Sequence, residues 1–136
     1  MKTLPLTVYV LGGDPVALAR ARYSIDNRRI YDSQKSIKLL AGIGLRSQHN
    51  DQPLLSGPLH LDVTFFMRIP PNSKRTTLLH QFKPDIDNLI KYLLDVSQSV
   101  LFDDDCVISQ ITAIKQYDTK PRTEFTLRSI KDVLSR

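Results

Sequence analysis

The residues from Leu59 to Arg68 constrain the fold of this chain most, because apolar and polar side chains alternate along them. In an extended chain, successive side chains point to opposite sides, so this pattern predicts a strand with one face on a core. The apolar face would hold Leu59, Leu61, Val63, Phe65 and Met67. Phe66 interrupts the polar face, which we therefore expect to be partly covered.

A second pattern predicts a helix that begins near Pro84 to Asp87 and runs to about Gln98. Its apolar residues recur at helical spacing and would form one buried stripe. That stripe holds Ile86, Leu89, Ile90, Leu93 and Leu94. On the more polar side, Asp87, Lys91 and Asp95 stand four residues apart, which is the spacing of ion pairs on a helix.

The remaining elements are predicted from shorter patterns, and we find neither an internal repeat nor a domain boundary. Residues 6–11 are predicted to form a strand with its apolar side chains at 6, 8 and 10 on one face. Asp32 or Ser33 would cap a helix that runs to about Leu40 or Leu45. Further strands are expected at 29–31, 107–117 and 123–130.

Length and composition favour one cytoplasmic domain spanning residues 1–136. A chain of 136 residues with 41% hydrophobic side chains can bury one proper core. No apolar run is long enough to cross a bilayer, and the first residues lack the pattern of a signal peptide. We therefore expect no membrane association.

The charge distribution indicates a site for metal ions in a protein that binds a polyanion. The chain carries a formal net charge of +5. Residues 83–105 hold six Asp and two Lys, which gives −4, so the remainder carries +9. A basic body suits nucleic acid, whereas clustered carboxylates repel it unless cations lie between them. The combination indicates a metal-dependent enzyme that acts on nucleic acid.

Asp85 and Asp87 are the first candidates for metal ligands. Two residues apart at the start of a helix, both side chains can be directed toward one ion, and Mg²⁺ commonly uses one or two carboxylates. The alternative interpretation is helix capping, in which a carboxylate accepts hydrogen bonds from free backbone N–H groups. Capping explains one of these aspartates better than two.

Asp103, Asp104 and Asp105 form a second acidic group, and the alternative interpretation is an ordinary turn. This group follows the predicted helix, whereas Asp85 and Asp87 precede it. Bringing the two groups together therefore requires a neighbouring subunit, or a chain path that the sequence does not fix. Cys106 is expected to be a small packed residue, with a pKa raised by the neighbouring aspartates.

The basic residues near these acids have both structural and functional interpretations. Lys91 could form an ion pair with Asp87 or stabilise negative charge that develops on a phosphate. Asp95 is expected to pair with Lys91 at the surface, not to bind metal. Candidate phosphate contacts are Arg20, Arg22, Lys83, Lys120 and Arg122, each of which could also be a solvated surface charge.

Together these residues resemble the RusA-type Holliday junction resolvases of bacteria and phages. The similarity lies in Lys83-Pro84-Asp85-Ile86-Asp87-Asn88-Leu89-Ile90-Lys91 and in Asp103-Asp104-Asp105-Cys106-Val107. Weaker matches are Gly13, Pro15, Arg20-x-Arg22, Arg29 to Asp32, Lys115, and Pro121 to Glu124.

The resemblance implies an α+β fold, a single small domain with a mixed β-sheet of about four strands flanked by two helices. It implies metal-ligand roles for Asp85, Asp87, Asp104 and Asp103, with Lys91 as the catalytic lysine. The implied cofactor is Mg²⁺, for which Mn²⁺ can substitute. The implied partners are a four-way DNA junction and a second identical subunit, with paired symmetric nicks as the outcome.

Two other functions fit the same residues. A different structure-selective metal nuclease would use the same carboxylates on another DNA shape. A non-catalytic DNA-binding module would need only the basic surface. A purely structural α+β protein with acidic turns is a further alternative that the clustered charge disfavours.

Overall fold

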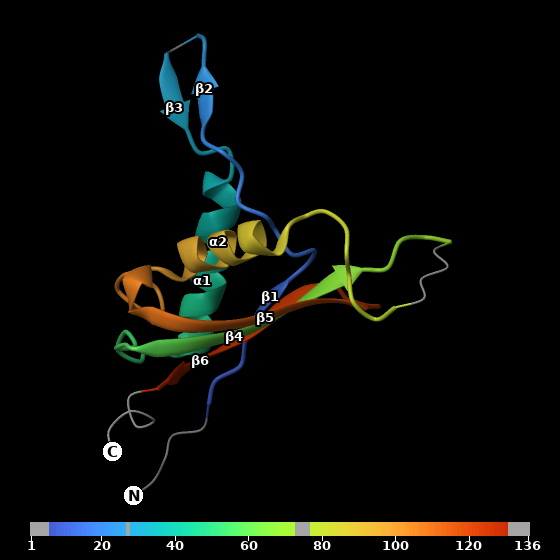
Figure 1. The fold of residues 1–136 in the computed structure, drawn as a ribbon. Helices are drawn as coiled ribbons and strands as arrows, with labels where there is room; N and C mark the ends of the chain where they lie inside the picture. The colour runs from blue at the N-terminus through green and yellow to red at the C-terminus, as the bar shows by residue number, and fades with distance from the viewer. Residues whose placement is uncertain (1–5, 27, 73–76, 131–136) are drawn as a thin grey trace, which may run out of the picture.

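The protein folds as one small α+β domain in the computed structural model, which describes residues 6–26, 28–72 and 77–130. Helix α2 lies on one face of a four-stranded mixed sheet, α1 packs against α2 and the β1 edge, and a two-stranded hairpin projects from this body (Figure 1). The strands and helices are β1 (Tyr9–Gly12), β2 (Arg22–Ser24), β3 (Arg29–Tyr31), α1 (Lys35–His49), β4 (Leu59–Arg68), α2 (Ile86–Ser97), β5 (Ile108–Asp118) and β6 (Arg122–Ser129). A short 3₁₀ helix, η1 (Asp105–Val107), precedes β5. The predicted fold class is confirmed.

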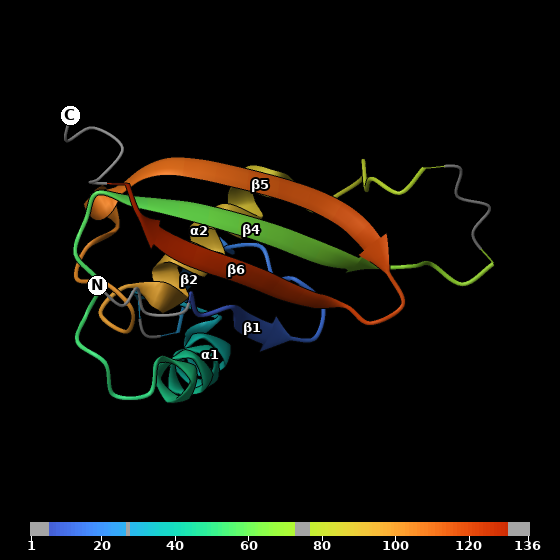
Figure 2. The ribbon, with the colours of Figure 1, turned by 90° about the horizontal axis from the view of Figure 1, so that it is seen from below.

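The strand order in the main sheet is β1-β6-β4-β5. β4 pairs in parallel with β5 and antiparallel with β6, which makes the sheet mixed. Figure 2 shows this sheet from its uncovered side, with α2 behind it and α1 beside its β1 edge. Among the described residues, no helix is both long and apolar enough to cross a membrane.

The core lies between the sheet and the helices, where the two clearest sequence patterns predicted it. All five apolar residues of the β4 face are buried, and the whole predicted strand forms with its predicted ends. α2 also matches its predicted range within two residues. Its most buried side chains are Leu89, Tyr92, Leu93 and Val96, while Ile86, Ile90 and Leu94 are partly buried.

The predicted side-chain pattern of the first strand is wrong. β1 begins at Tyr9, and Tyr9 is buried whereas Leu6 and Val8 are exposed. The Tyr9 ring stacks on Phe125 with centroids 5.2 Å apart, and its hydroxyl lies 2.8 Å from Nδ1 of His49. Because this aromatic packing and hydrogen bond fix the odd-numbered face inward, the aliphatic residues at 6 and 8 face outward.

α1 begins later and ends later than predicted. Its N-cap is Gln34, and Asp32 accepts a hydrogen bond from the Gln34 backbone N–H instead of capping the helix. The helix continues through Gly42 to His49, since Leu45 and His49 are buried in the core. Gly42 lies against Val100, so a small residue suits the contact between α1 and the turn after α2.

Gly57 is the glycine whose side-chain space is most restricted, and we predict that Gly57→Ala destabilises the fold. A Cβ at this position would lie 2.6 Å from Cβ of Val107 and 2.9 Å from its carbonyl oxygen. The resulting overpacking should cost about 3 kcal/mol of unfolding free energy. The matched control is Gly44→Ala in α1, where nothing lies within 4 Å; there we expect a gain of about 0.8 kcal/mol. Chemical denaturation measures both, and equal stabilities of the two variants would contradict the prediction.

Candidate active site

Asp85 and Asp87 lie together at the N-terminal end of α2. Asp85 is the N-cap residue, yet its side chain makes no capping hydrogen bond and instead accepts one from Lys83 Nζ at 2.9 Å. Asp87 lies in the first turn, with its carboxylate 3.9 Å from Lys91 Nζ. Both carboxylates are exposed. Side-chain capping therefore does not account for Asp85, and both carboxylates are accessible to a ligand from solvent.

Asp104 is the best-defined member of the second acidic group. It is the N-cap of η1, and its side chain accepts a hydrogen bond of 3.0 Å from the Cys106 backbone N–H. That bond holds the pKa of Asp104 below its usual range. Local hydrogen bonding in the turn thus accounts for one oxygen of this carboxylate, and Asp104 is exposed to solvent.

The residues on either side of Asp104 behave differently. Desolvation, reinforced by Asp104, raises the pKa of Asp105. Cys106 is exposed in the 3₁₀ turn, so the prediction that it packs inside is wrong. Its pKa is raised, chiefly by the charge of Asp104, as the sequence predicted. A thiol with a raised pKa in an acidic turn is a poor nucleophile.

Within one chain, the two acidic groups lie at opposite ends of α2 (Figure 1). The helix has 12 residues and is therefore about 18 Å long. Across residues 6–26, 28–72 and 77–130, no group of three or more His, Cys, Asp or Glu side chains could hold a metal ion. Two exposed carboxylates therefore lie at the start of α2, and the acidic turn lies at the other end of this helix.

Lys115 on β5 ties the segment before Asp85 to the sheet. Its ammonium donates to the carbonyl oxygens of Phe82 and Pro84, both at 2.7 Å. Desolvation lowers the pKa of this ammonium, and the charge of Asp85 opposes the shift. Beyond a weak family match, the sequence predicted no role for this lysine. The clue in the sequence was that Lys115 shares one face of β5 with Ile111, Ala113 and Tyr117. A charged group on a partly buried face requires hydrogen-bonding or ion-pair partners.

The expected pairing of Asp95 with Lys91 is wrong. Asp95 instead contacts Lys38 of α1, with 2.7 Å between the carboxylate oxygen and Nζ. Lys38 also binds Asp32 at 2.6 Å, so one partly buried lysine connects α1, α2 and the segment before α1. Lys91 has Asp87 as its acidic neighbour.

The five candidate DNA contacts occupy different environments. Arg20 and Lys120 are exposed, while Lys83 is exposed but engaged with Asp85. Arg122 is partly buried, bonded to Asp118 and Glu124, and its guanidinium lies 3.8 Å from the ring centroid of Phe66. Arg122 thus has a role in the β5–β6 turn. Arg22 lies on β2 of the projecting hairpin.

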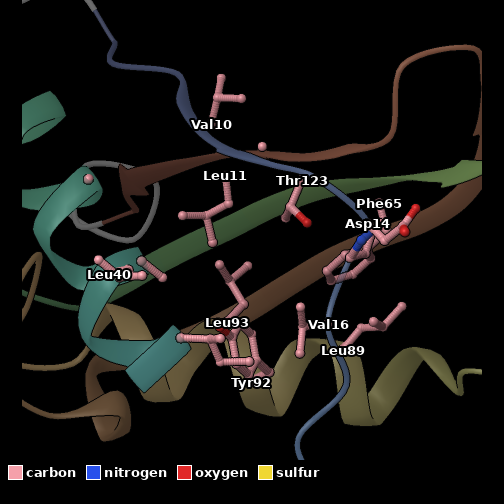
Figure 3. Close-up of a pocket in the computed structure, with 15 residues that line it drawn as sticks. Val10, Leu11, Asp14, Val16, Leu40, Phe65, Leu89, Tyr92, Leu93 and Thr123 are labelled. Atoms are coloured by element: carbon pink, nitrogen blue, oxygen red, sulfur yellow. The ribbon is translucent and has the colours of Figure 1, made fainter. Parts of the chain in front are cut away.

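None of the candidate metal-binding aspartates lines the mainly apolar pocket beside α2. It has a volume of about 440 Å³ and lies between the β1 segment and the two helices. Figure 3 shows Leu11, Leu40, Tyr92 and Leu93 directed into it, with Asp14 at one end. Asp14 pairs with Arg68. A mainly apolar pocket with one neutralised acid does not suit a phosphate backbone.

Comparison with known families decides the class of protein. The family model described as Endodeoxyribonuclease RusA matches residues 12–128. This chain belongs to the RusA family. The match covers both acidic groups, Lys91 and all five basic candidates. Membership supports an endodeoxyribonuclease of the kind that resolves Holliday junctions.

A relative of this RusA family member is the uncharacterized protein YqaN of Bacillus subtilis (strain 168). The two are 31% identical over 143 aligned residues, which cover 96% of this chain and 99% of YqaN. The similarity therefore extends over the full domain and is not confined to the acidic motif.

Proposed function

We propose that this protein is a Mg²⁺-dependent endonuclease that resolves four-way DNA junctions by paired symmetric nicks as a homodimer. The observation that carries the proposal is the pair of exposed carboxylates, Asp85 and Asp87, at the start of α2 in a chain of the RusA family. We place its action in the cytoplasm of a bacterium or of a phage-infected cell.

The donor set at the start of α2 fits a hard divalent cation. Asp85 and Asp87 offer carboxylate oxygens, which Mg²⁺ prefers, and leave room for water and a substrate phosphate. Mn²⁺ would accept the same ligands. A cation held there would polarise the scissile phosphate and lower the pKa of a bound water.

Lys91 would stabilise negative charge on the phosphate during cleavage. Its ammonium stands one turn after Asp87 on the exposed side of α2. The distance of 3.9 Å to Asp87 leaves it free to contact a DNA oxygen while remaining beside the carboxylates.

A second subunit would complete the site. The length of α2 separates Asp104 from Asp85 and Asp87 in one chain. If two copies meet so that the α2 helices run antiparallel about a two-fold axis, the acidic turn of each faces the start of the other's α2. Asp104, with Asp103 beside it, would then join the partner's Asp85 and Asp87. Two such sites suit the two-fold symmetry of a four-way junction.

Exposed apolar side chains support a homodimer. On α1, Leu39, Leu40 and Ile43 are each more than half exposed, as are Ile25 and Ile30 in the projecting hairpin region. An isolated two-stranded hairpin is marginally stable in water, so a hairpin with outward apolar residues fits one that packs on a partner.

We predict that Ile43→Asp weakens the dimer by at least about 100-fold in Kd, because an unpaired carboxylate buried in an interface costs about 3 kcal/mol or more. Sedimentation equilibrium measures this effect. The matched control is Gln110→Glu, which adds the same charge at an exposed position of β5, the sheet edge opposite to the β1 edge that α1 contacts. A wild-type chain that is monomeric at micromolar concentration would contradict the dimer, and an unchanged Kd in Ile43→Asp would contradict this interface.

DNA would be held by basic residues that lie outside the acidic groups. We propose Arg20, Arg22, Lys83, Lys120 and Arg122 as phosphate contacts. Lys83 would exchange its bond with Asp85 for a phosphate when that carboxylate binds a cation. Arg122 would contribute chiefly by orienting the turn that carries Lys120, whose carbonyl oxygen accepts a hydrogen bond from its guanidinium.

The test is cleavage of a synthetic four-way junction beside a linear duplex of the same sequence, each with Mg²⁺ and with EDTA. We expect metal-dependent nicks in the junction only. Equal cutting of both substrates would indicate a general metal nuclease. Junction binding without cutting, with Mg²⁺ as well as with EDTA, would leave a DNA-binding module, in which the basic surface and not the carboxylates carries the function.

A further inference from the structure

We propose that Lys115 is a positioning residue, which holds the chain before Asp85 so that Asp85 and Asp87 can bind a divalent cation. This inference rests on the proposed function, because it concerns the same carboxylates. It adds a residue on a different element, β5, whose side chain acts on the carboxylates through the backbone of residues 82–84.

The segment from Leu78 to Pro84 follows the outer edge of β5 and then leaves it. Backbone hydrogen bonds hold its first part, from Tyr117 N–H to the Leu78 carbonyl at 2.9 Å and from His80 N–H to the Lys115 carbonyl at 3.0 Å. Beyond His80 the chain turns toward α2. There the Lys115 side chain holds the segment through its two hydrogen bonds to the carbonyl oxygens of residues 82 and 84.

These bonds direct the Lys115 ammonium toward the backbone of residues 82–84. Two of its three N–H donors are used by neutral carbonyl oxygens, and no ion pair within 4.0 Å involves it among the described residues. It belongs to the half-buried part of the sheet, on the face that the helices cover. Because two carbonyl oxygens hold the Lys115 ammonium, this side chain orders residues 82–84. The same bonds leave it poorly placed to contact a phosphate.

The position of Asp85 depends on restraints on both sides. After it, the Asp85 carbonyl oxygen accepts the first backbone bond of α2 from Leu89 N–H at 3.2 Å. Before it, Lys115 holds the carbonyl of Pro84, the adjacent residue. The Asp85 side chain makes no capping bond, and its carboxylate is held by the exposed side chain of Lys83, so the backbone chiefly sets where the carboxylate lies. Asp87 follows two residues later and shares the same anchor.

A positioning role and a catalytic role of Lys115 would give different experimental results. If Lys115 acts through the backbone of residues 82–84, its loss weakens cation binding and loosens this segment even without DNA or metal. Cleavage at saturating Mg²⁺ would fall much less than the affinity for the cation. If Lys115 instead touched the reacting phosphate, the maximal rate would fall and the cation affinity would not change.

Two measurements on the full-length Lys115→Met protein test this prediction. Direct Mn²⁺ titration should show affinity about 10- to 100-fold weaker than wild type, the range for residues that orient metal ligands. Hydrogen exchange of metal-free protein should be faster in residues 82–91 and unchanged in β6. Lys115→Arg should recover most of the affinity, since a guanidinium can also donate to both carbonyls.

The matched control is Arg128→Met, which removes an exposed cation from β6 at the end of the sheet far from Asp85. It should leave both readouts at the wild-type level. Unchanged Mn²⁺ affinity and exchange in Lys115→Met would overturn the inference, as would faster exchange spread over the whole domain. If wild type bound no Mn²⁺, the proposed function would fail, and the exchange of residues 82–91 would still decide whether Lys115 holds the segment.

Discussion

Asp85→Asn and Asp87→Asn should each reduce cleavage of a four-way junction by about 1,000-fold or more, the scale for losing a residue that acts directly in catalysis. Each substitution removes one negative charge from the cation site and leaves the shape of the side chain unchanged. Junction binding should persist or tighten, because one source of repulsion toward phosphate is gone. Single-turnover cleavage and a gel-shift titration in EDTA measure the two effects separately.

The matched control for these variants is Asp95→Asn on the same helix. Asp95 is paired with Lys38 and lies two turns beyond Asp87, away from the start of α2. The Asp95→Asn protein should cleave the junction at a rate within about threefold of the wild-type rate, because a partly exposed ion pair is worth about 0.5 kcal/mol. Near-normal cleavage by both the Asp85→Asn and the Asp87→Asn protein would contradict the proposal that these two residues bind the catalytic cation.

Mixing Asp87→Asn subunits with Asp104→Asn subunits should restore cleavage that neither variant shows alone. If each site takes Asp85 and Asp87 from one subunit and Asp104 from the other, a mixed dimer has one doubly altered site and one intact site. Random exchange makes about half of the dimers mixed, so about a quarter of all sites should be active. The activity should appear as nicking of one strand per junction.

The control mixture combines Asp85→Asn with Asp87→Asn. Both residues come from the same end of α2, so every site in such a mixed dimer carries one substitution and no activity should return. Restored nicking in the first mixture and none in the second is the expected pair of results. No restoration in either mixture, with mixed dimers shown to form, would place all three aspartates in the same subunit's site.

The elements with strong periodicity were predictable from the sequence. The alternation from Leu59 to Arg68 fixed β4 with its buried face, because one register alone buries five large apolar side chains. The apolar stripe of α2 likewise predicted the position and the buried face of the helix at whose start Asp85 and Asp87 lie. The spacing of apolar residues was therefore enough to place these two acids at the start of a helix.

The errors arose where tertiary contacts outweigh local pattern. Tyr9 faces inward because it packs on Phe125 and bonds His49, and neither partner is near it in sequence. α1 passes through two glycines because Leu45 and His49 beyond them are buried. Local propensity contains no information about such distant partners.

The position of the acidic turn relative to α2 was predictable from the sequence, whereas the long-range contacts of two lysines were not. The sequence indicated that the acidic turn follows α2, and the structure places it at the far end of that helix. The roles of Lys38 and Lys115 were missed, since their partners, Asp95 and the carbonyls before Asp85, become neighbours only in the fold. For Lys115, the clue in the sequence pattern was the place of a lysine on the apolar face of β5.

Cleavage of a supercoiled plasmid that extrudes a cruciform tests the central claim most directly, because the cruciform base is a four-way junction. Two coordinated nicks convert the plasmid to linear DNA, whereas a single nick relaxes it and the cruciform is reabsorbed. With Mg²⁺, we predict linear product with symmetry-related nicks in opposite strands, and no product with EDTA. Nicked circles alone, or equal cutting of a plasmid without the inverted repeat, would contradict a dimeric junction resolvase.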